Sequence, residues 1–115
     1  MHTDIEKWNH FQDQLGFDTV WSIWEVADID TEIFTNKPRT VFYTFIDEGV
    51  TVEELIANRI RYNTVSAVAA NGTVRELWAA AESCYQQARA LGDWHYFVED
   101  FVMQDNGTLK LVTGS

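Results

Sequence analysis

The stretch Thr73–Gly92, TVRELWAAAESCYQQARALG, carries the clearest structural signal in the chain. Its apolar residues recur every three or four positions and form one stripe, made of Val74, Leu77, Trp78, Ala81, Cys84, Tyr85, Ala88 and Leu91. This spacing predicts an amphipathic helix whose apolar side packs on a core. Thr73 and Glu76 have the spacing of a capping box at its start, and Gly92 is suited to end it.

A first helix is predicted near the N-terminus from the same start signature, Thr3 followed by Glu6. It should cover about residues 4–15, because one face of that segment is apolar and consists of Ile5, Trp8, Phe11 and Leu15. Gly16 is suited to follow its last turn.

Another helix is predicted from Val52, where Thr51 and Glu54 give a third capping box. Its inward positions would be Leu55, Ile56 and Ile60. The pattern leaves its end open, because it suits a helix that ends near Tyr62 as well as one that continues to Asn71-Gly72.

Four segments rich in β-branched and aromatic residues predict strands, at residues 19–26, 40–46, 94–103 and 108–112. The last two flank Asp105-Asn106-Gly107, in which Asn-Gly would supply the positive φ of a tight hairpin turn. The predicted fold class is α+β, with a small antiparallel sheet of about four strands in two hairpins and about three helices on one face. A chain of 115 residues is expected to form one compact domain over residues 1–115.

Two tryptophans in the first predicted strand, Trp21 and Trp24, cannot share a face because they are three residues apart. We therefore expect one of them to point inward and the other outward, where it could anchor a partner. The alternative is that the sheet and the first helix bury both.

Negative charge is concentrated in the first half of the chain. The formal net charge is −10, and residues 1–57 account for −9 of it. Such a protein repels phosphate backbones and anionic membranes, so direct binding to nucleic acid or to a membrane is not expected. A basic protein surface would be attracted instead.

The segment Glu25–Ile33, EVADIDTEI, contains four acidic residues and no basic one. A calcium loop here would need Gly at its sixth position and Glu at its twelfth, where Ile33 and Arg39 stand. A phosphatase motif Asp-x-Asp-x-Thr fails as well, because Thr31 directly follows Asp30. A bare Asp-x-Asp pair leaves a magnesium–nucleotide site as an alternative, but we predict no metal and no cofactor.

No motif for nucleophilic or acid–base catalysis is visible, so we predict no catalytic residues and no enzymatic activity. Cys84 lies on the apolar stripe and is interpreted as a core residue. His95 is interpreted as a surface or half-buried ring on a strand. Glu99 and Asp100 would face opposite sides of that strand, so one of them is expected to point inward and pair with an arginine.

The leading functional hypothesis is a small acidic inhibitor domain that occupies a basic surface of a partner, such as a nucleic-acid-binding enzyme. If EVADIDTEI extends a strand, Asp28, Asp30 and Glu32 share a face and join further acids of the first half of the chain in one broad negative patch. The predicted partner-binding residues are Glu25, Asp28, Asp30, Glu32, Asp47, Glu48, Glu53, Glu54 and Trp21. In size and charge the chain is similar in type to phage-encoded anti-CRISPR and anti-restriction proteins, some of which mimic nucleic acid, although no family motif carries this similarity.

One alternative is that the acidic half of the chain only aids solubility. Two other hypotheses give the protein a different function. The aromatic-rich sheet, with Trp94, Tyr96 and Glu99 or Asp100, could line a small-molecule pocket. A self-complementary aromatic surface would instead produce a homodimer. The chain shows no secretory signal and no apolar run of about 20 residues, which predicts a cytoplasmic location.

Overall fold

The computed structural model describes residues 3–23, 25–47 and 49–114. Its elements in chain order are α1 (Thr3–Leu15), β1 (Val20–Trp21), β2 (Arg39–Ile46), α2 (Val52–Ile56), β3 (Tyr62–Ala69), α3 (Val74–Ala90), β4 (Phe97–Met103) and β5 (Leu109–Gly114). Among the described residues, no helix is both long enough and apolar enough to span a membrane.

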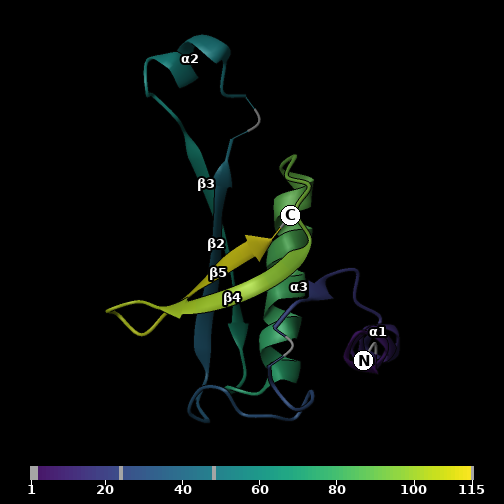
Figure 1. Ribbon diagram of the computed structural model, residues 1–115. Coiled ribbons are helices and arrows are strands. Elements are labelled where there is room, and N and C mark those ends of the chain that lie inside the picture. The colour runs from purple at the N-terminus through teal and green to yellow at the C-terminus, as the bar shows by residue number, and fades with distance from the viewer. Residues whose placement is uncertain (1–2, 24, 48, 115) are drawn as a thin grey trace.

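Five strands form one sheet in the order β1-β4-β5-β2-β3 (Figure 1). β4 and β5 form the predicted antiparallel hairpin, and β2 and β3 form a second one. β1 pairs with β4 and β2 pairs with β5 in parallel, so the sheet is mixed. The α+β class is therefore confirmed, whereas the prediction of about four antiparallel strands is wrong in the number and direction of the strands.

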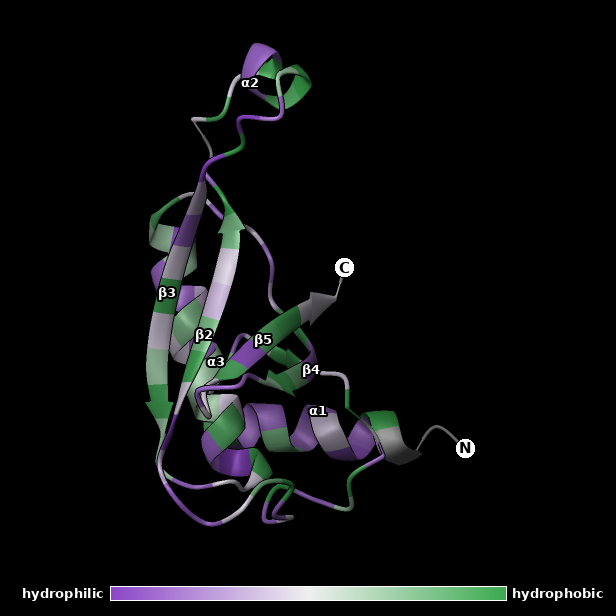
Figure 2. Cartoon of the chain, turned by 90° about the vertical axis from the view of Figure 1, so that its left-hand side faces the viewer, coloured by the Kyte–Doolittle hydropathy of each residue, from purple (hydrophilic) through white to green (hydrophobic). Residues whose placement is uncertain are grey.

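The helices do not all lie on one face of the sheet. α3 packs along β2 and β3, and in Figure 2 it lies behind these two strands. α1 packs beside β1, and α2 lies beyond the sheet at the tip of the β2–β3 hairpin (Figure 1). No described helix covers the side of β2 and β3 that faces away from α3. We call this side the open face, and its residues are Thr40, Phe42, Thr44, Ile46, Tyr62, Thr64, Ser66 and Val68.

The core lies between α3, α1 and the sheet. Every residue of the predicted α3 stripe is buried except Leu91, which follows the helix and is 46% exposed. Trp21 is stacked with Trp8 of α1 and contacts Trp78 of α3, with ring centroids 6.1 and 5.6 Å apart. These indole contacts join the three parts of the protein, and a buried aromatic ring of this size stabilises a fold by roughly 1.5–3 kcal/mol.

Glu82 on α3 fixes the connection between α1 and β1. One of its carboxylate oxygens accepts hydrogen bonds from the backbone N–H groups of Asp18 (3.1 Å) and Thr19 (2.9 Å). The indole Nε1 of Trp78 donates to the Thr19 carbonyl at 2.9 Å. The backbone of the fully buried Thr19 is therefore satisfied by two side chains of one helix.

The second helix begins where predicted but is shorter than either of the two predicted ends, near Tyr62 or at Asn71-Gly72, would give. The capping box of Thr51 and Glu54 is present, but α2 is only 5 residues long and no residue of it is buried. Ile56 is 81% exposed rather than inward. The segment that could have continued this helix forms β3, which pairs with β2 over its whole length.

The boundaries of the other elements lie close to the predicted ones, with one exception. α1 begins and ends near the predicted residues, and Gly16 after it has a φ of +71°. The capping contacts predicted for Thr3 lie outside the described side chains. The first predicted strand is reduced to Val20–Trp21, and Trp24 lies outside the described residues.

The segment EVADIDTEI does not extend a strand. The Asp28 carboxylate accepts a hydrogen bond from the Asp30 N–H at 2.8 Å, and the Asp28 N–H donates to the Thr31 hydroxyl at 3.0 Å. These bonds form a turn that buries Ile29, and Glu32 then makes an isolated β-bridge with Thr73. The acids of this segment therefore do not line one face of a strand.

Candidate functional site

The predicted acidic patch is divided between two ends of the molecule. Loop 25–34 lies near the start of β2 and the start of α3, whereas α2 follows the far end of β2 (Figure 1). β2 has 8 residues, and a strand of that length spans about 25 Å. Glu53 and Glu54 therefore cannot act together with Asp28, Asp30 and Glu32 on one compact surface.

Several of these acids have local structural partners. Asp30 forms an ion pair with Arg75 at 3.2 Å, and Glu54 pairs with Arg61 at 3.5 Å in addition to its capping role. Asp47 accepts hydrogen bonds from the Gly49 N–H and the Asn63 amide, and these bonds lower the pKa of its carboxyl. These intramolecular contacts account for Asp30, Asp47 and Glu54 without a binding role for them.

The structure does not place two other predicted partner-binding residues on the described surface. Trp21 is 1% exposed, so it belongs to the core and cannot anchor a partner at the surface. Glu48 lies outside the described residues.

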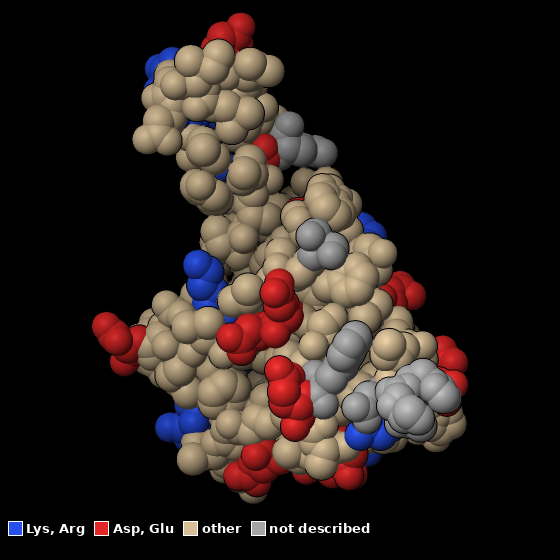
Figure 3. Space-filling model, viewed as in Figure 1, with Lys and Arg blue, Asp and Glu red and all other residues tan. Residues whose placement is uncertain are grey.

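One acidic depression does occur on the surface, of about 540 Å³, and it includes Glu25 of the predicted set. Its lining residues are Ser22, Ile23, Glu25, Glu99, Asp100 and Val112. None of them is basic, so the three carboxylates have no counter-charge within the lining. In Figure 3 acidic side chains likewise gather near the middle of the molecule, on the face seen in that view.

A β-bulge in β4 explains why both Glu99 and Asp100 are exposed. Val98 pairs with Thr113 and Asp100 pairs with Val112, so Glu99 is an extra residue in β4. The extra residue allows Val98 and Phe101 to be buried together while the two acids between them point outward. The prediction that one of these acids points inward is therefore wrong.

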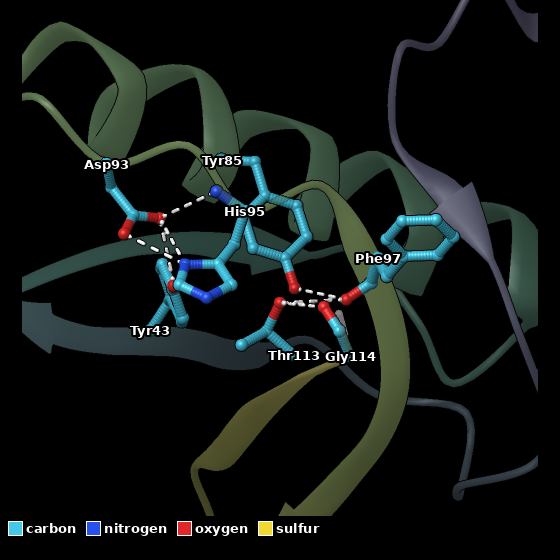
Figure 4. A network of polar contacts seen from close by, with 7 residues as sticks. All are labelled: Tyr43, Tyr85, Asp93, His95, Phe97, Thr113 and Gly114. Atoms are coloured by element: carbon cyan, nitrogen blue, oxygen red, sulfur yellow. Dashed lines mark hydrogen bonds and ion pairs between the residues drawn. The ribbon is translucent and has the colours of Figure 1, made fainter.

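A second candidate site surrounds Asp93 and His95, in the loop between α3 and β4 (Figure 4). The side chain of Asp93 is 7% exposed. Its carboxylate accepts hydrogen bonds from the Tyr43 hydroxyl at 2.9 Å and from the backbone N–H of His95 at 3.2 Å. The Nδ1 atom of His95 lies 3.0 Å from the same carboxylate. Tyr43 and His95 therefore meet at one buried acid.

The buried phenols of this region have raised pKa values. Burial is the main cause for Tyr43, and its hydrogen bond to Asp93 and the charge of that carboxylate add to the effect. Burial also raises the pKa of Tyr85, whose hydroxyl donates to the Phe97 carbonyl at 2.6 Å. Thr113 donates to the same carbonyl at 3.1 Å (Figure 4). Both phenols are therefore hydrogen-bond donors at neutral pH.

A pocket of about 450 Å³ opens beside Asp93 and His95. Its lining residues are Tyr43, Thr44, Phe45, Ile46, Asp47, Gly92, Asp93, Trp94, His95 and Thr113. Trp94 stacks on His95 with ring centroids 3.9 Å apart and is 64% exposed. Tyr96, Glu99 and Asp100 do not line this pocket, although the sequence suggested them together with Trp94.

The Asp93 carboxylate and the His95 imidazole are polar groups of this pocket that contact one another. Asp93 contacts the Nδ1 side of the imidazole, and within the described part of the chain no hydrogen bond to its Nε2 atom is seen. Among the described residues, no group of His, Cys, Asp or Glu has the geometry to hold a metal ion. The one cysteine, Cys84, is fully buried in the core, where desolvation raises its thiol pKa to about 12, so it cannot act as a nucleophile in the pocket.

Sequence patterns do not reveal the Asp93–His95–Tyr43 arrangement. Asp93 and His95 are two residues apart in a loop, and Tyr43 lies 50 residues before Asp93. The only local signal in the sequence is the aromatic character of the segment that contains Trp94 and His95. No protein-family model matches the chain, and neither the curated proteins nor the solved structures include a significant match.

Proposed function

We propose that this protein is an acidic binding domain that occupies a basic surface of a partner protein, of the kind that binds nucleic acid. The observation that carries the proposal is the acidic depression, where Glu25, Glu99 and Asp100 lie without a counter-charge in the lining. A lysine or arginine side chain that enters the depression is attracted by more than one carboxylate. The net charge of −10 would also speed the encounter with a basic partner.

Such binding would make the domain an inhibitor by competition. A basic groove that holds a phosphate backbone presents positive charges that an acidic surface can occupy in its place. The proposed contact surface is the bulged part of β4 together with Glu25. The acids of α2 are too far away to take part in the same contact.

A charge-matched pair of variants tests this proposal. Glu99→Gln with Asp100→Asn removes two charges at the depression, and Glu53→Gln with Asp105→Asn removes two exposed charges elsewhere. Binding of an arginine-rich peptide is measured by NMR titration at about 50 and about 300 mM salt. We expect shifts at the depression, at least about tenfold weaker binding for the first variant, and little change for the second. Equal weakening of the two variants would show that only net charge matters, and the proposal would be wrong.

A second candidate function is the binding of a small planar amine in the Asp93–His95 pocket. Its walls are aromatic, and of the residues that the structure describes, Asp47 and Asp93 are the charged ones in its lining and no lysine or arginine lines it. Such a pocket favours a cation that stacks on a ring over an anion.

The test for this second function compares tryptamine with indole-3-acetate, which share a ring system and differ in charge. We expect tryptamine to cause saturable NMR shifts at Trp94 and His95, and Trp94→Ala to abolish them. Because Trp94 is 64% exposed, this variant keeps the core intact. Equal responses to both compounds, or no saturable response to either, would exclude the amine site.

A further inference from the structure

β3 forms one edge of the sheet and lacks the usual protection of an edge strand. Its sequence, YNTVSAVA, contains no charged residue and no proline, and its pairing with β2 is continuous and free of bulges. Natural edge strands are normally short, charged, interrupted or covered, because their free backbone groups can pair with another chain. The opposite edge is formed by β1, which has only 2 residues. β3 is therefore the long unprotected edge.

The register of β2 and β3 identifies the backbone groups that point outward. The carbonyl of Arg61 accepts from the Asp47 N–H, so in the antiparallel ladder the odd-numbered residues of β3 bond to β2. The even-numbered residues Tyr62, Thr64, Ser66 and Val68 then direct their N–H and C=O groups away from the sheet. Gln87 of α3 confirms this direction, because its amide donates to the outward carbonyl of Ser66 at 2.8 Å.

The two ends of β3 carry opposite charge. Arg59 and Arg61 precede the strand, and Arg59 has no ion pair among the described residues. Beyond the strand, Glu32 is exposed and bridged to Thr73. An antiparallel pair of β3 strands places the basic end of one copy beside the acidic end of the other. A parallel pair would place like charges together, so the charges select the antiparallel arrangement.

We propose that two copies of this chain associate through antiparallel pairing of their β3 strands, which joins the two sheets into one. With the twofold axis beside Val65, Tyr62 of each copy pairs with Val68 of the other, and Thr64 pairs with Ser66. Tyr62 and Val68 are 59% and 66% exposed, and an aromatic residue opposite a β-branched one is a favourable cross-strand pair. The Gln87 amide must release the Ser66 carbonyl, which exchanges one hydrogen bond for another. This interface is separate from the acidic depression and from the Asp93–His95 pocket.

The test is sedimentation velocity of the full chain at about 0.15 M salt, where repulsion between net charges is largely screened. We expect a concentration-dependent dimer that Ser66→Pro abolishes, since proline removes an outward N–H while β2 keeps its ladder bonds. Arg59→Glu should weaken the dimer about tenfold, and adding Glu32→Arg should restore it. Lys110→Glu makes the same charge change on β5 and should have little effect.

Two further measurements test the dimer without relying on the folding of Ser66→Pro or of the charge variants. In the unchanged protein, amide exchange at Thr64, Ser66 and Val68 should slow as concentration rises. Gln87→Ala should leave the dimer as strong or stronger, because it frees the Ser66 carbonyl. A protein that stays monomeric up to millimolar concentration, or a dimer with unchanged exchange at these amides, would overturn the proposal.

Discussion

Replacing Glu82 tests how α3 holds the connection between α1 and β1. Glu82→Ala would remove the acceptor for the N–H groups of Asp18 and Thr19. The Asp18 N–H is near solvent and can bond to water, whereas Thr19 is fully buried and its N–H would stay unsatisfied. A hydrogen bond to a charged group contributes about 1.5–3 kcal/mol, so we expect a loss of about 2–3 kcal/mol in the free energy of unfolding. For a chain of 115 residues this corresponds to a fall in Tm of roughly 10 °C.

Protonation of Glu82 should have a related effect. Burial raises the pKa of its carboxyl, but hydrogen bonds from Gln86 and from the Thr19 and Asp18 N–H groups outweigh burial and lower the pKa overall. A lowered pKa in the folded state means that the charged form adds stability above the unfolded value near 4.5, and that this contribution is lost as the pH falls further. Glu82→Gln should therefore destabilise the protein at pH 7 and have a diminishing effect below about pH 4.5.

The assay is urea unfolding of the unchanged protein, Glu82→Gln and Glu82→Ala between pH 7 and pH 3, followed by circular dichroism. Glu76→Ala is the matched control, because it removes an acid from the same helix that has no such contact with the 18–19 segment. The control should lose less than about 1 kcal/mol. If Glu82→Ala costs no more than the control, or if the effect of Glu82→Gln is constant with pH, the assigned role of the carboxylate is wrong.

Three further outcomes are expected. The Cys84 thiol, with its pKa raised to about 12 by burial, should not react with a thiol reagent at pH 8 until the protein is unfolded by denaturant. Gly72→Ala should lower the free energy of unfolding by at least about 3 kcal/mol or prevent folding, because the added Cβ would lie 2.0 Å from the Phe34 carbonyl oxygen. Gly107→Ala should lower it by only about 1–2 kcal/mol, because its Cβ has no atom within 4 Å and only the positive φ is unfavourable. Urea unfolding measures both effects. Tyr43→Phe should cost about 1.5–3 kcal/mol in the same measurement, and much less when Asp93→Asn is already present, because the two side chains share one hydrogen bond.

Secondary structure is easiest to predict from the sequence where the apolar residues recur with a single period. α3 is predicted almost to the residue, because its apolar stripe has only the helical period. The sequence leaves a helix over residues 62–70 as one alternative, because the inward residues Val65 and Ala69 of β3 are four apart, a spacing that suits both a helix turn and alternate positions of a strand. The adjoining alanines added helical propensity, and pairing with β2 overrode it.

The candidate site depended on contacts that local patterns do not contain. The bulge at Glu99 arises from the register between β4 and β5, which no spacing within β4 reveals. The single acidic patch was predicted on the assumption that residues 25–33 form a strand, whereas hydrogen bonds within residues 28–31 form a turn there. Glu25 is the one predicted binding residue that lines the depression, and its charge alone, not its spatial neighbours, is visible in the sequence.

The small helix α2 offers a practical point of attachment to this protein. None of its residues is buried, and its capping box closes the helix with contacts internal to residues 51–54. A change in the length of this segment would therefore leave the core contacts of α3 untouched. Residues 51–57 are a suitable place for an inserted affinity tag or fluorescent label.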